Sequence, residues 1–270
     1  MAPRYVIGTE VPPPGGSREH EGTVHVTKVE DVRQTLQVTR QAFWHLGLES
    51  AWERVAAVVV QPGVEFGDDF VLDYQPEAAF DLARFIESEP RLVYEAHSTD
   101  YQDSRNLQNL VRDHFAILKV GPALTFAFRE AVFALAMMEE ALLPPGERSN
   151  LIAVLDDVMV RHPEHWQKYY PGTPAQQAFK RKYSLSDRIR YYWIAPEVKV
   201  AFERLVKNLG EQPLPLSLVS QFLPGWYARM RATGSAIPIE AILLENIGAV
   251  LQDYALAVGD SNFPLIFEDK

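Results

Sequence analysis

The sequence predicts an α/β protein with a parallel sheet, followed by a helical extension. Four short apolar runs occur in the first half of the chain, at residues 4–9, 55–61, 91–96 and 115–120. Each is β-branched or aliphatic on both faces, which is typical of strands that are buried on both sides. A helical pattern follows each run, and this alternation indicates parallel strands joined by crossover helices.

The helical patterns divide the chain into two parts. In the first part they cover residues 29–46, 76–88, 104–113 and 125–143. No buried-strand pattern follows, and further helices are expected at residues 149–160, 186–192, 196–209, 216–230 and 238–258, separated by proline- and glycine-containing breaks. We therefore expect about four βα units in residues 1–143 and a helical extension in residues 144–270.

Composition excludes several classes of protein. The 26 basic and 36 acidic side chains give a net charge of −10, which disfavours nucleic acid and anionic membranes as partners. The absence of cysteine excludes disulfides, thiolate zinc sites, iron–sulfur clusters and cysteine nucleophiles. No apolar run reaches the roughly 20 residues of a membrane span, so a soluble, cytoplasmic protein is expected.

Polar side chains follow the predicted strands where each strand ends. Glu10 follows the first strand, Glu65 the second, the segment 95–100 ends the third, and Lys119 ends the fourth. Ligands of parallel α/β proteins bind at the carboxyl ends of the strands. We therefore expect these side chains to share one edge of the sheet and to form a site.

The segment 95–100, EAHSTD, is the densest polar run at a strand end. Glu95 and His97 lie two residues apart and so share one face of a strand. One imidazole with one or two carboxylates suits a divalent ion such as zinc or manganese. The alternative, favoured for this motif alone, is a buried histidine satisfied by Asp100. Glu10 could be a metal ligand, an acid–base group or an acceptor for a sugar hydroxyl.

Two further segments suit a phosphate. Lys119, Gly121 and Thr125 lie where a strand runs into a helix, whose N-terminal N–H groups favour anions. Arg188 lies in an arginine- and tyrosine-rich helix start that could clamp a phosphate or a sugar. The alternatives are a tight turn with an outward lysine, and an arginine-rich helix that packs against the sheet.

Three common catalytic motifs are missing from the sequence. It contains no G-x-x-x-x-G-K-[ST], no G-x-G-x-x-G and no G-x-S-x-G. The chain therefore lacks the phosphate loop of nucleotide-dependent kinases, the dinucleotide fingerprint and the nucleophile elbow of hydrolases.

Five segments together carry a family resemblance. They read YVIGTEVP at 5–12, VQPGVEF at 60–66, VYEAHSTDY at 93–101, DHFAILKVGPALTF at 113–126 and YSLSDRIRYYW at 183–193. The chain resembles the non-catalytic (accessory) subunit family of class II D-tagatose-1,6-bisphosphate aldolase. This resemblance implies a TIM-type barrel with C-terminal helices, and a separate catalytic subunit as partner in galactitol or N-acetylgalactosamine catabolism.

The resemblance leaves two kinds of function open. The first is an accessory subunit that supports the activity and stability of the aldolase. The second is an enzyme, since some relatives are metal-dependent sugar C4-epimerases. Family members are also labelled tagatose-6-phosphate kinases, but the absence of a phosphate loop does not support this label. As an enzyme, the chain would use these expected groups: Glu10, Glu65, Glu95 and Asp100 for acid–base chemistry, Ser98, Lys119, Gly121, Thr125 and Arg188 for a sugar phosphate, and His97 with Glu10 for a metal.

The resemblance also implies a short N-terminus. The chain starts at what looks like the fifth strand of the family's barrel, so we expect only its C-terminal half, with about four parallel strands. Such a sheet has two open edges, which favour pairing with another chain. We therefore expect a homo-oligomer, an assembly with a partner, or an unstable isolated chain.

Overall fold

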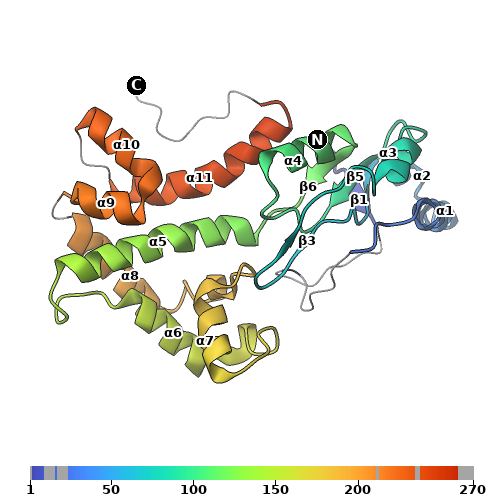
Figure 1. Cartoon of the computed structure of the whole chain (residues 1–270). Coiled ribbons are helices and arrows are strands. Elements are labelled where there is room, and N and C mark those ends of the chain that lie inside the picture. The colour runs from blue at the N-terminus through green and yellow to red at the C-terminus, as the bar shows by residue number, and fades with distance from the viewer. Residues whose placement is uncertain (1, 9–15, 17–23, 211–212, 235–237, 261–270) are drawn as a thin grey trace. The chain divides into compact units, whose positions relative to one another are not determined.

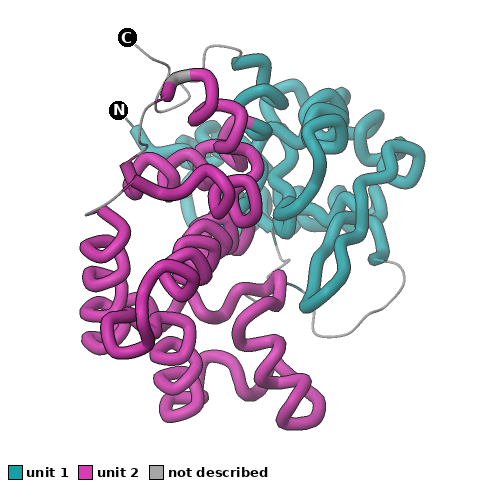
Figure 2. The backbone as a smooth tube through the Cα atoms, turned by 60° about the vertical axis from the view of Figure 1, so that its left-hand side comes forward, with its two compact units in different colours: residues 1–121, 253–263 teal, residues 122–252, 264–270 magenta. Residues whose placement is uncertain are grey.

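The computed structural model describes residues 2–8, 16, 24–210, 213–234 and 238–260. It divides the chain into two compact units, coloured separately in Figure 2. The first comprises residues 1–121 and 253–263, and the second comprises residues 122–252 and 264–270. The predicted α/β class with a parallel sheet is confirmed, and many helices accompany the sheet.

The first unit is built on a four-stranded parallel sheet in the order β1-β2-β5-β6. These strands are β1 (Tyr5–Ile7), β2 (Val55–Val59), β5 (Val93–Ala96) and β6 (Phe115–Leu118). Val59 of β2 lies opposite Glu95 of β5, which in turn lies opposite Ile117 of β6. The carboxyl ends of these three strands are therefore aligned at one edge of the sheet.

The described part of the first unit also contains helices, including the last turns of α11 (Ile239–Ala257), and a β-hairpin (Figure 1). The helices that lie wholly within this unit are α1 (Val29–His45), α2 (Glu49–Trp52), α3 (Phe80–Ile86) and α4 (Ser104–Arg112). The hairpin pairs β3 (Glu65–Phe66) with β4 (Val71–Leu72) in an antiparallel arrangement. Gln102 holds this region in place, because its side chain donates to the Leu72 carbonyl at 2.9 Å and accepts from the Tyr74 N–H at 2.9 Å.

The second unit is helical among its described residues. Its elements are α5 (Pro122–Leu142), α6 (Leu151–Arg161), η1 (Pro163–His165), α7 (Pro174–Tyr183), η2 (Arg188–Tyr191), α8 (Pro196–Gly210), α9 (Leu216–Phe222), α10 (Pro224–Thr233) and most of α11 (Ile239–Ala257). Helix α5 packs against α6, α8 and α9, and its buried residues from Ala131 to Met138 contribute to the core of this unit. Packing therefore divides the chain before α5, whereas the sequence pattern suggests a boundary after it.

Several elements of the second unit differ from the expected pattern. The helix expected at residues 186–192 is the short 3-10 helix η2. The helix expected at residues 216–230 is two helices, because Pro224 has no N–H to donate and instead begins α10. Helix α7 has a weak apolar pattern, but Thr173 and Gln176 form a capping box and Pro174 occupies its first turn. No helix in the described part of the chain is both long and apolar enough to cross a membrane.

Candidate ligand site at the strand ends

Glu95 organises a polar cluster at the carboxyl edge of the sheet. Its Oε1 lies 3.1 Å from His97 Nε2 and 3.3 Å from Lys119 Nζ. The Glu95 side chain is only 7% exposed, whereas His97 and Lys119 are 31% and 53% exposed. A buried carboxylate therefore orients two nitrogen groups that remain accessible to a ligand.

The loop that carries His97 is fixed to the end of the neighbouring strand. The Thr99 hydroxyl donates to the Lys119 carbonyl at 2.8 Å, and the Lys119 N–H donates to the Ala96 carbonyl at 2.9 Å. Ser98 and Tyr101 have φ values of 55° and 64°, in the left-handed region that non-glycine residues rarely adopt. Such strain persists only where surrounding contacts enforce it, so this loop is held in one conformation.

Tyr254, near the end of α11, provides one of these contacts. Its hydroxyl donates to the Thr99 carbonyl at 2.8 Å and lies 3.1 Å from the Thr99 hydroxyl. Sequence reasoning missed Tyr254 and its contact with Thr99, because 155 positions separate the two residues and Tyr254 has no distinctive local pattern. The terminal turns of α11 therefore support the candidate site from within the first unit.

Glu65 of β3 and Asp100 are two acidic groups beside the loop that carries His97. Glu65 Oε1 accepts from the Phe66 N–H at 3.0 Å, and its side chain is also hydrogen-bonded to Ser98. Burial raises the pKa of Glu65, and the nearby charge of Asp100 adds to this effect. Glu65 is thus a carboxyl group that can hold its proton to a higher pH than an exposed glutamate. We call Glu65, Glu95, His97, Ser98, Asp100 and Lys119 the strand-end site.

The raised pKa of Glu65 predicts a pH-dependent effect of Glu65→Gln. Ionisation of Glu65 destabilises the fold, and this penalty develops as the pH rises above the unfolded-state pKa near 4.5. Glutamine cannot ionise but keeps an oxygen to accept from Phe66. We expect E65Q to melt at a higher temperature than the parent at about pH 8 and at a similar temperature at about pH 4. Thermal melts followed by circular dichroism at both pH values test this; a lower melting temperature for E65Q at about pH 8 contradicts it.

Three residues expected to bind phosphate already donate to carboxylate or carbonyl oxygens. The Gly121 N–H donates to Asp100 Oδ1 at 2.9 Å. In the second unit, the Thr125 hydroxyl donates to Asp187 Oδ2 at 2.6 Å, and Arg188 Nη1 donates to the His165 carbonyl at 3.1 Å. Burial lowers the pKa of Arg188, which is 3% exposed. The phosphate roles of Gly121, Thr125 and Arg188 stay predictions, and the predicted roles of Glu10 fall outside the described residues.

The described residues of the strand-end site do not by themselves fit a metal centre. Across the described ranges, no three histidine, aspartate or glutamate side chains converge as metal ligands would. His97 and Glu95 offer two metal-ligand atoms, but the positively charged Lys119 Nζ lies 3.3 Å from the same Glu95 oxygen that contacts His97. A zinc or manganese ion usually needs a third protein ligand. The expected ligand pair of His97 and Glu10 therefore stays a prediction.

The strand-end site is suited to a polar ligand with several hydroxyl groups. Carboxylates are acceptors for hydroxyl protons, and Lys119 and His97 can donate to a carbonyl or a phosphate. Burial raises the pKa of Glu65, so this carboxyl group holds a proton to a higher pH than an exposed glutamate does.

Comparison with known proteins identifies the family. Residues 1–259 match the model of a family described as D-tagatose-1,6-bisphosphate aldolase subunit GatZ/KbaZ-like. The chain belongs to this family. The match confirms the resemblance predicted from the five sequence segments.

Individual GatZ/KbaZ-like relatives support this assignment. The chain is 51% identical over 250 residues to the D-tagatose-1,6-bisphosphate aldolase subunit GatZ of Klebsiella pneumoniae, covering 93% of this chain and 59% of the relative. It is 50% identical over 251 residues to the same subunit of Salmonella dublin, with the same coverage. A crystal structure named a probable tagatose 6 phosphate kinase from Sinorhizobium meliloti matches with a TM-score of 0.85 and 42% identity, over 94% of this chain and 62% of that one. The chain thus spans about three fifths of the relatives it matches.

Proposed function

We propose that this chain acts as an accessory subunit of a class II tagatose-1,6-bisphosphate aldolase, together with a separate catalytic chain. The observation that carries the proposal is the 51% identity, over 93% of the chain, to a protein named as a subunit of this aldolase. A net charge of −10 agrees with a protein or sugar partner rather than a nucleic acid. The chain would work in the cytoplasm, in galactitol or N-acetylgalactosamine catabolism.

The strand-end site would bind a sugar phosphate in this role. Lys119 is the candidate for the phosphate, since it is half exposed and held in place by Glu95. Glu65 and Asp100 would accept hydroxyl protons of the sugar, and His97 would donate to its carbonyl. A ligand would gain further contacts only by replacing existing hydrogen-bond partners, which are carboxylate or carbonyl oxygens, of Ser98, Gly121, Thr125 and Arg188.

The parallel sheet would be the C-terminal part of a TIM-type barrel. The chain order β1, β2, β5, β6 is also the spatial order, as in a barrel in which each strand pairs with the next. Strands β1 and β6 are the edges of the described sheet, and an open edge can pair with another chain. This arrangement supports assembly with a partner or with a second copy.

The alternative enzyme, a metal-dependent ketohexose C4-epimerase, has less support. The names of the matched GatZ relatives describe aldolase subunits and not epimerases. A kinase activity is not supported either, because the sequence contains no phosphate loop.

The experiment is co-expression of this chain with the catalytic chain of a class II tagatose-bisphosphate aldolase. We expect the two chains to co-purify and the complex to cleave tagatose 1,6-bisphosphate faster than the catalytic chain alone. Separate elution together with an unchanged cleavage rate would contradict the proposal.

A further inference from the structure

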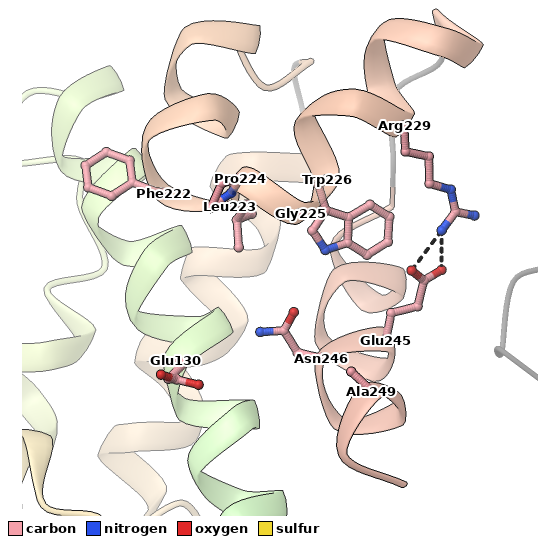
Figure 3. A pocket seen from close by; sticks show the side chains of 10 residues that line it. All are labelled: Glu130, Phe222, Leu223, Pro224, Gly225, Trp226, Arg229, Glu245, Asn246 and Ala249. Carbon is pink, nitrogen blue, oxygen red and sulfur yellow. Dashed lines mark hydrogen bonds and ion pairs between the residues drawn. The ribbon is translucent and has the colours of Figure 1, made fainter. Parts of the chain in front are cut away.

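A cavity of about 400 Å³ opens in the second unit, and no residue of the strand-end site lines it. Figure 3 shows it between α5, the junction of α9 and α10, and α11. Its walls combine two aromatic rings with charged and amide groups. The residues that supply these groups are Glu130, Phe222, Trp226, Arg229, Glu245 and Asn246. This volume lies within the range of small-molecule sites.

One side of the cavity is lined by an ion pair between Arg229 and Glu245. Arg229 Nη1 lies 2.6 Å and 2.8 Å from the two carboxylate oxygens of Glu245, as the dashed lines in Figure 3 show. The Arg229 guanidinium also lies over the Trp226 ring, 5.1 Å from its centroid. Because Arg229 offsets the charge of Glu245, this side of the cavity contributes little net charge.

The opposite side carries an unbalanced negative charge. Glu130 projects from α5 into the cavity, and no hydrogen bond or ion pair joins its carboxylate to another described residue. Partial burial raises the pKa of Glu130, although neighbouring Arg129 partly opposes this. The Asn246 side chain extends from α11, with its Nδ2 at 3.5 Å from the Ala127 carbonyl.

We propose that this cavity binds a small organic ammonium ion. The ammonium group would pair with Glu130, and its hydrocarbon part would lie against Trp226 and Phe222, since aromatic faces attract cations and cover apolar surface. An anion would be repelled by Glu130, and a neutral apolar molecule would leave the Glu130 carboxylate desolvated without a partner. This assignment does not depend on the aldolase role or on the strand-end site.

The test is a titration of the whole chain with n-butylammonium, compared with n-butanol as a neutral probe of similar shape. The indole N–H signal of Trp226, assigned with a W226F variant, reports binding by nuclear magnetic resonance. We expect a saturable shift with n-butylammonium, and binding at least about tenfold weaker for n-butanol. Equal affinity for the two probes, or no saturable shift, would overturn the proposal.

Paired variants of α5 identify the charged partner. Glu130→Gln keeps the shape of the side chain and removes its charge, so it should weaken n-butylammonium binding by about tenfold and leave n-butanol binding unchanged. Glu140→Gln, an exposed position on the same helix outside the cavity, is the control and should bind n-butylammonium like the parent. Circular dichroism confirms that both variants are folded. Unchanged affinity of folded E130Q would show that Glu130 does not bind the cation.

Discussion

Replacing Arg129 by alanine is expected to destabilise the second unit by about 3 to 5 kcal/mol. Arg129 Nε donates to Asp187 Oδ1 at 2.9 Å, and the two side chains are 3% and 0% exposed. The Arg129 guanidinium also donates to the Lys182 carbonyl and lies over the Phe126 ring, 3.9 Å from its centroid. Without Arg129, the buried Asp187 carboxylate would lose its bonded guanidinium and keep the Thr125 hydroxyl, which donates to Asp187 Oδ2 at 2.6 Å. Urea unfolding followed by far-ultraviolet circular dichroism measures the loss.

Arg161→Ala is the matched control for this variant. Arg161 also pairs with carboxylates, Asp157 at 3.0 Å and Glu197 at 3.2 Å, but its side chain is 45% exposed. Exposed ion pairs contribute about 0 to 1 kcal/mol, so R161A should unfold close to the parent. If R129A costs no more than R161A, the buried pair does not stabilise the second unit as described.

Lys119→Met is expected to weaken binding of tagatose 6-phosphate by about 10- to 100-fold, the effect of losing one charge-assisted hydrogen bond. Methionine retains the length of the stem and removes the ammonium group that Glu95 orients. Because Lys119 is half exposed, the variant should fold like the parent. Unphosphorylated tagatose should lose much less affinity, since it lacks the group that Lys119 is proposed to bind. Calorimetric titration measures both ligands.

Lys199→Met controls for a general loss of positive charge. Lys199 is an exposed residue of α8 in the other unit, so K199M should bind tagatose 6-phosphate like the parent. Equal affinities of K119M and K199M would remove Lys119 from the strand-end site.

Local patterns predicted most helices and all four strands of the parallel sheet. The sequence predicts helix α4 because its apolar positions recur at helical spacing. In the structure, the Asp103 side chain accepts from the Asn106 N–H at the start of this helix. The β3–β4 hairpin was not expected, because strands of two residues are too short for an alternating pattern. Gln102, from a distant part of the chain, supports this hairpin, and such a contact has no local signal.

Local patterns also predicted part of the candidate site. Glu95 and His97 share a strand face through the two-residue period, and parallel pairing aligns Lys119 with them. Partners distant in sequence were not predictable, because many residues of the same type could have served. Tyr254 on Thr99 is one such contact, and the pairing of Arg129 with Asp187 across 58 positions is another.

The cleavage rate of tagatose 1,6-bisphosphate, at a fixed concentration of class II catalytic chain and increasing amounts of this chain, tests the proposed function most directly. An accessory subunit predicts a rate that rises and saturates as the two chains reach a fixed ratio. A rate that stays constant over the whole titration, with a catalytic chain known to be folded, would contradict the account.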